Sequence, residues 1–287
     1  GVQTCALPIS KATFPELAVS LNKARKIILV GDHQQLPPVL DTELIRDNRE
    51  KIDEENLMEG IFEKLYDMFP EGNKHRLTVQ YRMHPTIGTL ISHVFYNDEI
   101  QNGVSKEERS LGIEGYENIA IEWIATSKRS EGERYEKVYE NNGKRSYKNN
   151  LEKNIIKQKL IDLDSKLKEK TKIAIITGYG PQKYILQTMV RQQSFKNLDI
   201  DVDTVDAFQG SQKDIIIYST VRSSSNPYGI GFLKSEARIN VAFSRARCLL
   251  IIVGDIEFLD NYRIRGNKFP QIIEYIKSSE NCRIIQY

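Results

Sequence analysis

The chain has 287 residues, enough for one large domain or two smaller ones with an ample core. Its 41 Lys and Arg residues against 39 Asp and Glu residues leave a net charge of +2, so composition does not indicate a nucleic-acid-binding protein and any such site must be local. Cys5, Cys248 and Cys282 are too scattered for a disulfide framework or a zinc cluster, which fits an intracellular protein of the cytoplasm or nucleus. The longest apolar runs have the length of a strand, so we expect no membrane span.

Short apolar, β-rich runs alternate with helical patterns along the chain. The predicted strands are residues 26–30, 119–124, 172–177, 202–205, 214–221, 249–253 and 282–286. The predicted helices are residues 57–69, 86–95, 151–167, 181–193, 236–248 and 269–278. Most strands are continuously apolar, and alternation of strand and helix predicts an α/β fold with a mainly parallel sheet flanked by helices. Residues 41–56, 103–115 and 126–150 interrupt this pattern and are expected to be solvated loops or insertions.

The first polar segment follows a predicted strand, in KIILVGDHQQLPPVL. Gly31, Asp32 and Gln35 come directly after the apolar run, and the proline pair at 37 and 38 stiffens the exit. Functional loops in parallel sheets follow the carboxyl ends of strands, so this segment is a candidate site. The alternative is that the Gly-Asp and Pro-Pro pairs only turn the chain.

The second polar segment is LTVQYRMHP, which places Arg82 between Tyr81 and Met83. Pro85 is expected near the start of a helix. His84 could be a metal ligand or a base, but a lone histidine is more often a structural hydrogen-bonding group.

Two further segments carry polar side chains at strand ends. In TGYGPQK, Tyr179 and Gln182 could stack on or hydrogen-bond to a nucleic-acid base, although a tyrosine at the rim of a sheet is the commoner explanation. In TVDAFQGSQKDIIIYSTVRS, Gly210 would let the backbone approach a ligand closely, and Gln209 and Gln212 suit sugar hydroxyls or a nucleic-acid backbone.

Three arginines lie in RINVAFSRAR, residues 238–247. A helix here would carry one apolar stripe, formed by Ile239, Ala242, Phe243 and Ala246. Arg238 and Arg245 would then share one flank of that stripe. These guanidinium groups are either solvated rim charges around a core helix or a cluster directed at an anion such as phosphate, and the stretch alone does not decide between the two.

In this order, GDHQQLPP, QYRMHP, TVDAFQGSQKD and NVAFSRAR resemble motifs III, IV, V and VI of superfamily-one helicases, in the branch that includes the nonsense-mediated-decay helicase and senataxin. The resemblance covers residues 10–255 and implies a RecA-like, P-loop NTPase fold. It implies that residues 1–75 are the end of a first RecA-like domain and that residues 76–287 are a second one. It also implies ATP and magnesium in a cleft between two such domains, with single-stranded RNA or DNA as the partner.

The resemblance assigns roles to individual residues. The catalytic residues that it implies are Arg82 and Arg245, as arginine fingers that stabilise charge on the transferring phosphoryl group, and Gln35, which senses the γ-phosphate. The further nucleotide contacts that it implies are Gly31, Asp32, Gly210 and Gln212. The nucleic-acid contacts that it implies are Tyr179, Gln182, Thr204 and Val205. It assigns no metal ligand.

The sequence also departs from the family pattern. It contains no G-x-x-x-x-G-K-[ST] phosphate-binding loop and no apolar strand that ends in Asp-Glu, and Gln212 stands where motif V usually has a glutamate. Residues 1–9, GVQTCALPI, do not fit the family and are interpreted as foreign sequence. We therefore expect a C-terminal fragment of a helicase, monomeric and without ATPase activity by itself.

Two alternatives remain. The chain could be a non-catalytic nucleic-acid-binding or scaffold protein with a degenerate helicase fold. A Rossmann-type enzyme is disfavoured, because Gly178-Tyr179-Gly180 lacks the third glycine of the dinucleotide fingerprint.

Overall fold

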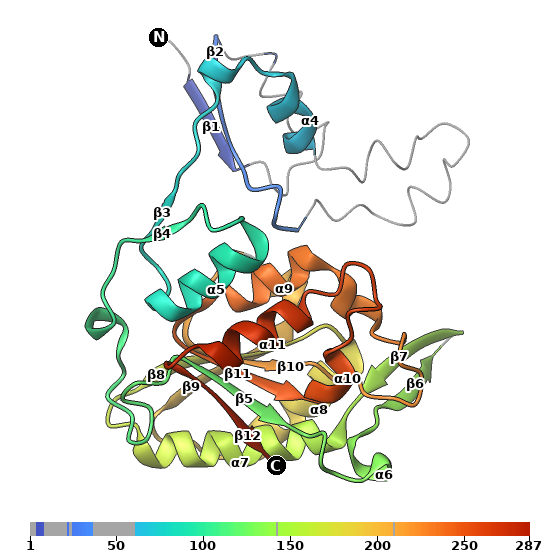
Figure 1. Cartoon of the computed structure of the whole chain (residues 1–287). Coiled ribbons are helices and arrows are strands. Elements are labelled where there is room, and N and C mark those ends of the chain that lie inside the picture. The colour runs from blue at the N-terminus through green and yellow to red at the C-terminus, as the bar shows by residue number, and fades with distance from the viewer. Residues whose placement is uncertain (1–3, 9–21, 23–24, 37–60, 142, 209) are drawn as a thin grey trace. The chain divides into compact units, whose positions relative to one another are not determined.

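A computed structural model describes residues 4–8, 22, 25–36, 61–141, 143–208 and 210–287 (Figure 1). The chain divides into two compact units, Gly1–Arg76 and Leu77–Tyr287. The division falls one residue after the predicted boundary. Among the described residues, no helix combines the length and the apolar character that crossing a bilayer requires.

The first unit contains a two-stranded parallel sheet and a helix. Strand β1 (Thr4–Pro8) pairs in register with β2 (Lys26–Val30), and α4 (Ile61–Met68) is followed by the short 3-10 helix η1 (Glu71–Asn73). The strand β1 was not predicted, because its five residues were set aside with residues 1–9 as foreign. Their pairing with β2 gives that interpretation no support, and it stays a prediction. Residues 41–56 lie outside the described residues.

The second unit is built on a six-stranded sheet with the order β12-β5-β11-β10-β8-β9. Its strands are β5 (Ile121–Ala125), β8 (Thr171–Thr177), β9 (Leu198–Thr204), β10 (Lys213–Ser219), β11 (Ala246–Gly254) and β12 (Cys282–Gln286). Every pair in this sheet is parallel. The predicted fold class is therefore confirmed, and the four inner strands are largely buried, as the continuous apolar runs indicated.

Helices cover both faces of the sheet (Figure 1). One face carries α5 (Pro85–Phe95), α9 (Glu236–Phe243) and α11 (Phe269–Ser278), with the short α10 (Ile256–Leu259) between α9 and α11 in the chain. The other face carries α7 (Asn150–Lys166) and α8 (Gly180–Arg191), whose buried leucines join the alternate residues of β8, β10 and β11 in one core. Aromatic pairs mark the first face, where Trp123 meets Phe269 and Tyr218 meets Phe243 edge to face. The result is a three-layer α/β/α unit.

The helices begin where the sequence supplies capping groups. His84 accepts a hydrogen bond from the Thr86 backbone before α5, which has Pro85 in its first turn. Asn149 caps α7 through the Glu152 backbone N–H, and Ser235 caps α9. Each cap satisfies one of the backbone donors that a helix start leaves unpaired.

One sequence prediction was wrong in this unit, and another was incomplete. The helix predicted over 236–248 ends at Phe243, because residues 246–254 form the buried central strand β11. Arg238 and Arg245 therefore do not share the flank of one helix. The insertion over 126–150 is not a plain loop but contains α6 (Glu131–Arg134) and a hairpin of β6 (Lys137–Asn141) and β7 (Lys144–Lys148). The remaining short elements are β3 (Val79–Gln80), β4 (Gln101–Asn102) and the 3-10 helices η2 (Glu107–Arg109), η3 (Val205–Phe208) and η4 (Gly231–Lys234).

Candidate functional site

The candidate residues of the second unit lie at two opposite edges of the sheet. We call the side on which β10 and β11 begin the amino edge, and the side on which β5, β8, β9, β10 and β11 end the carboxyl edge. Arg82, Gln212 and Arg245 gather at the amino edge, next to the first residues of β10 and β11. These three residues therefore do not lie at the carboxyl edge, where functional loops in parallel sheets are generally expected.

Arg82 and Arg245 contact the same serine. The Arg82 Nη1 donates to the Ser244 carbonyl oxygen at 3.1 Å, and the Arg245 Nη2 donates to the Ser244 hydroxyl at 3.2 Å. Arg82 Nε also donates to Gln212 Oε1 at 3.0 Å, while Arg245 Nη1 donates to the Ser211 carbonyl at 3.3 Å. Two guanidinium groups from segments 162 residues apart thus lie on one short stretch of backbone.

The two arginines differ in exposure. Arg245 is 2% exposed, and its Nε donates to the Val241 carbonyl at 3.0 Å. Arg82 is half-buried, and burial lowers the pKa of its guanidinium below its ordinary value, with Tyr96 acting in the opposite direction. Arg82 has no carboxylate partner within the residues that the structure describes, and its side chain contacts neutral oxygens. A partly buried cation with neutral partners is suited to an anionic ligand.

Two side chains that the sequence did not single out hold the Arg82 loop. Gln80 Oε1 accepts from the backbone N–H groups of Arg82 and Met83, both at 2.8 Å. Arg109 Nε donates to the Arg82 carbonyl at 2.8 Å and its Nη2 to the Tyr81 carbonyl at 2.6 Å. Gln80 could have been suspected from its place beside the loop, whereas no local pattern marks Arg109, which lies 27 residues away.

His84 has a structural role here. It caps α5, is buried, and its backbone N–H donates to the Arg247 carbonyl at 2.7 Å. Burial lowers its pKa to about 4, with Lys106 acting in the same direction, so the imidazole is neutral at physiological pH. Within the described part of the chain, no group of three or more His, Cys, Asp or Glu side chains is placed to hold a metal ion.

The loop before β10 has the conformation that its glycine allows. Gly210 has a φ of 90°, in the left-handed region that favours glycine, and it is exposed. Gln212 is exposed next to it, with its side-chain oxygen occupied by Arg82. Gln209 lies outside the described residues.

The predicted nucleic-acid contacts lie at the carboxyl edge, but most of their side chains are buried. Tyr179 is 2% exposed, and its ring packs between Tyr147 and Phe232 with centroid distances of 5.6 and 5.5 Å. Gln182 is fully buried and donates to the Asn149 carbonyl and the Ser219 hydroxyl. Val205 is buried and Thr204 is half-buried. In this conformation the Tyr179 ring has no open face for a base, and the binding role of all four residues stays a prediction.

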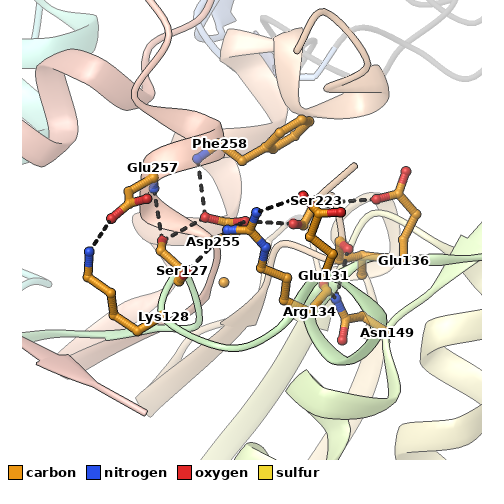
Figure 2. Close-up of polar contacts among 12 residues, drawn as sticks. Ser127, Lys128, Glu131, Arg134, Glu136, Asn149, Ser223, Asp255, Glu257 and Phe258 are labelled. Carbon is orange, nitrogen blue, oxygen red and sulfur yellow. Dashed lines mark hydrogen bonds and ion pairs between the residues drawn. The ribbon is translucent and has the colours of Figure 1, made fainter. Parts of the chain in front are cut away.

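A second cluster at the carboxyl edge joins the ends of three strands (Figure 2). Asp255, directly after β11, accepts hydrogen bonds from the hydroxyls of Ser127 and Ser223, both at 2.6 Å. It also forms an ion pair with Arg134 at 3.4 Å and caps α10 through the Phe258 N–H. Ser127 follows β5 and Ser223 follows β10, so one buried carboxylate fixes the loops after all three strands.

Glu152 of α7 is a buried carboxyl group that contacts the carboxyl end of β10. It accepts from the Ser219 hydroxyl at 2.5 Å and from the Val221 N–H at 2.8 and 3.0 Å. Burial raises its pKa to about 8, against the effect of these hydrogen bonds. Val221 has a φ of 69°, a conformation that is costly for a β-branched residue and that these contacts hold in place.

In the first unit, the residues after β2 form a turn. The Asp32 carboxylate accepts from the Gln34 N–H at 3.0 Å and from Gln35 Nε2 at 2.8 Å, and the Gln35 N–H donates to the Asp32 carbonyl at 3.1 Å. Gly31, Asp32 and Gln35 are half-buried. The proline pair at 37 and 38 lies outside the described residues.

A family model described as an AAA domain matches residues 57–257. Several characterised proteins are similar over nearly the whole chain. The DNA polymerase alpha-associated DNA helicase A of Saccharomyces cerevisiae is 32% identical over 96% of this chain and 40% of its own length. The regulator of nonsense transcripts 1 of Caenorhabditis elegans is 32% identical over 94% of this chain and 24% of its own length. The ATP-dependent helicase upf1 of Schizosaccharomyces pombe is 33% identical over 89% of this chain and 27% of its own length.

The chain belongs to this AAA domain family and has its RecA-like α/β fold. Within it, the chain is a superfamily-one helicase sequence of the nonsense-mediated-decay branch, as its motifs indicated. It spans less than half the length of these three relatives.

Proposed function

We propose that this chain is part of an ATP-dependent helicase, in which Arg82 and Arg245 contact the γ-phosphate of ATP while the carboxyl edge faces a single nucleic-acid strand. The observation that carries the proposal is the shared contact of both guanidinium groups with Ser244. Two positive charges at one place are the arrangement that stabilises charge on a transferring phosphoryl group.

The surroundings of the two arginines support a phosphate ligand. Among the described residues, Arg82 contacts only neutral oxygens, so a bound phosphate would give it an anionic partner. Arg245 is held by the oxygens of Val241, Ser211 and Ser244, so its guanidinium has a fixed position before a phosphate binds. The Gln80 and Arg109 contacts fix the backbone of Arg82, which limits the reorganisation needed when a nucleotide arrives.

ATP, when bound, supplies the phosphoryl group that is transferred to water, and it needs residues that hold its phosphates. The 287 residues contain no phosphate-binding loop, so that task falls to residues outside this sequence. We assign Gly31, Asp32 and Gln35 to the nucleotide side and Gly210 and Gln212 to the ribose, as the motifs imply. We assign no residue to magnesium. The chain by itself is expected to hydrolyse ATP at a negligible rate.

The test is ATP hydrolysis by a natural polypeptide that contains this chain together with a phosphate-binding loop, with and without single-stranded RNA or DNA. Arg245→Ala should lower the stimulated kcat by about a thousandfold, the lower end of the range for an arginine finger. Arg247→Ala is the matched control, because Arg247 is two residues away and pairs with Asp214 at a half-exposed position. Equal rates for the two variants would remove Arg245 from this role. No hydrolysis in the unchanged protein would favour the non-catalytic alternative.

A further inference from the structure

The β6–β7 hairpin extends from the carboxyl edge of the sheet (Figure 1). All residues of β6 are exposed, and so are the first two of β7. Val138 and Tyr139 are 59% and 44% exposed. Neither the mechanism above nor the helicase motifs use this hairpin.

The register of the hairpin separates two different faces, because directly opposed residues share one face. One face pairs Lys137 with Lys148, Tyr139 with Ser146, and Asn141 with Lys144. The other face pairs Val138 with Tyr147 and Glu140 with Arg145. We call the first of these the lysine face.

The charges on the two faces differ. Glu140 and Arg145 neutralise one another at 2.6 Å on the second face. None of the three lysines on the lysine face has a carboxylate partner within the described residues: Lys137 contacts the Gly132 carbonyl, and Lys148 lies 5.9 Å from the Tyr139 ring centroid. Lys137 and Lys148 face one another directly, and like charges opposite one another destabilise a hairpin unless an anion lies between them.

The hairpin is firmly attached to the rest of the unit. Before β6, Glu136 pairs with Arg222 at 3.1 Å and accepts from the Ser223 N–H at 2.7 Å. After β7, Asn149 donates to the carbonyls of Arg134 and Val221. Figure 2 shows Glu136 and Asn149 beside the Asp255 cluster. An isolated two-stranded hairpin is marginally stable in water, so these contacts give the exposed strands a fixed position.

We propose that the lysine face is a binding surface for single-stranded nucleic acid, with Lys137, Lys144 and Lys148 contacting phosphates and Tyr139 stacking on a base. The inference rests on the proposed function, because it adds a contact to the strand that the carboxyl edge faces. Alternating positive charge and an exposed aromatic ring is the combination by which proteins bind single strands without sequence preference. RNA and DNA share this chemistry. An acidic protein surface would use the lysines but would leave the tyrosine ring without a base to stack on.

The experiment measures fluorescence anisotropy of labelled 20-nucleotide oligo(dT) and oligo(U) with the 287-residue chain over a range of salt concentrations. Three variants are compared: Lys137→Gln/Lys144→Gln/Lys148→Gln, Tyr139→Ala, and a charge-matched control, Lys168→Gln/Lys170→Gln/Lys277→Gln. The control lysines are exposed and lie outside the hairpin, two between α7 and β8 and one on α11. The four hairpin residues that are replaced are exposed or half-buried, so the variants should fold. The midpoint of thermal unfolding, measured for each variant, verifies this.

The lysine-face triple variant should bind at least about tenfold more weakly than the control, and its slope of log K against log salt should be smaller by about 2, since each single-strand phosphate contact contributes roughly 0.7. Tyr139→Ala should weaken binding about tenfold with an unchanged salt slope. Comparing the two oligonucleotides shows whether RNA or DNA is preferred.

Equal affinity of the lysine-face variant and its control, with the unchanged chain binding normally, would overturn this inference and leave the proposed function intact. Poly-L-glutamate serves as a model of an acidic protein surface. If the lysine-face variant lost its binding to poly-L-glutamate but bound both oligonucleotides as well as the unchanged chain does, the inference would also be overturned, in favour of a protein partner. If the unchanged chain binds neither oligonucleotide, both this inference and the strand-binding part of the proposed function fail.

Discussion

The guanidinium carbon of Arg222 lies 3.9 Å from the centroid of the Tyr147 ring. Arg222 belongs to the loop after β10, and Tyr147 belongs to the hairpin strand β7. Tyr147 in turn meets Tyr179, which meets Phe232, and Arg238 of α9 lies 5.1 Å from the Phe232 centroid. A continuous row of rings and cations therefore connects the hairpin with the helix that precedes Arg245.

Replacement of Arg222 by alanine should destabilise the protein strongly. Arg222 and Glu136 are both under 8% exposed as side chains, so the variant leaves a buried carboxyl group without its ion-pair partner. We expect the free energy of unfolding to fall by about 3 kcal/mol or more, measured by urea denaturation. Arg222→Ala/Glu136→Gln should recover part of this loss, and a loss below about 1 kcal/mol in the single variant would contradict the buried pairing.

Glu152 should make stability fall as pH rises. The ordinary pKa of 4.5 applies to the unfolded chain, whereas burial raises the folded-state pKa to about 8. Between these values the unfolded chain has lost the proton that the folded protein still holds, so the contribution of Glu152 is complete below pH 4.5 and is lost as the pH approaches 8. The difference in unfolding free energy between the protein and Glu152→Gln should therefore change by roughly 5 kcal/mol over this range, in favour of the variant at high pH. Parallel curves for the two proteins would show that Glu152 ionises normally.

Gly254→Ala, which adds a single methyl group, should destabilise the folded protein strongly. A Cβ atom at Gly254, the last residue of β11, would lie 1.9 Å from the Thr220 hydroxyl oxygen and 3.0 Å from two further Thr220 atoms. Since both strands are central in the sheet, neither backbone can move away, and we expect a loss of about 3 kcal/mol. Gly180→Ala is the control, because a Cβ there meets nothing within 4 Å. Equal stabilities for the two variants, compared by thermal unfolding, would contradict the close approach.

The sequence predicted the sheet well because its four inner strands are largely buried. The runs that became β8, β10 and β11 are continuously apolar, and the helix 269–278 was placed at its observed bounds. The hairpin was missed because its strands face solvent on most sides, which removes the alternation that marks a half-buried strand. The end of α9 was missed because the local sequence AFSRA is compatible with a helix. Ala246 instead begins β11, because pairing with the neighbouring strands of the sheet outweighs this local preference.

The candidate site was predictable in part for similar reasons. The motifs singled out Arg82 and Arg245, and the structure brings both to Ser244. Arg109, Glu152 and Asp255 act through contacts with residues far away in the chain, and a single sequence carries no sign of such contacts. Tyr179 and Gln182 are buried. The sequence could not show this, because an aromatic or amide residue after a strand can either contact a ligand or pack in the interior.

Strand β11 begins directly after Arg245 and ends directly before Asp255. Its nine residues span roughly 30 Å, and an extended backbone in the middle of a sheet can be neither lengthened nor shortened without breaking its ladder of hydrogen bonds. A displacement of Arg245 along the strand axis must therefore move Asp255 as well. The three loops that contact or contain Asp255 would move with it. The strand therefore couples the position of Arg245 at the amino edge to the loops that carry the hairpin at the carboxyl edge.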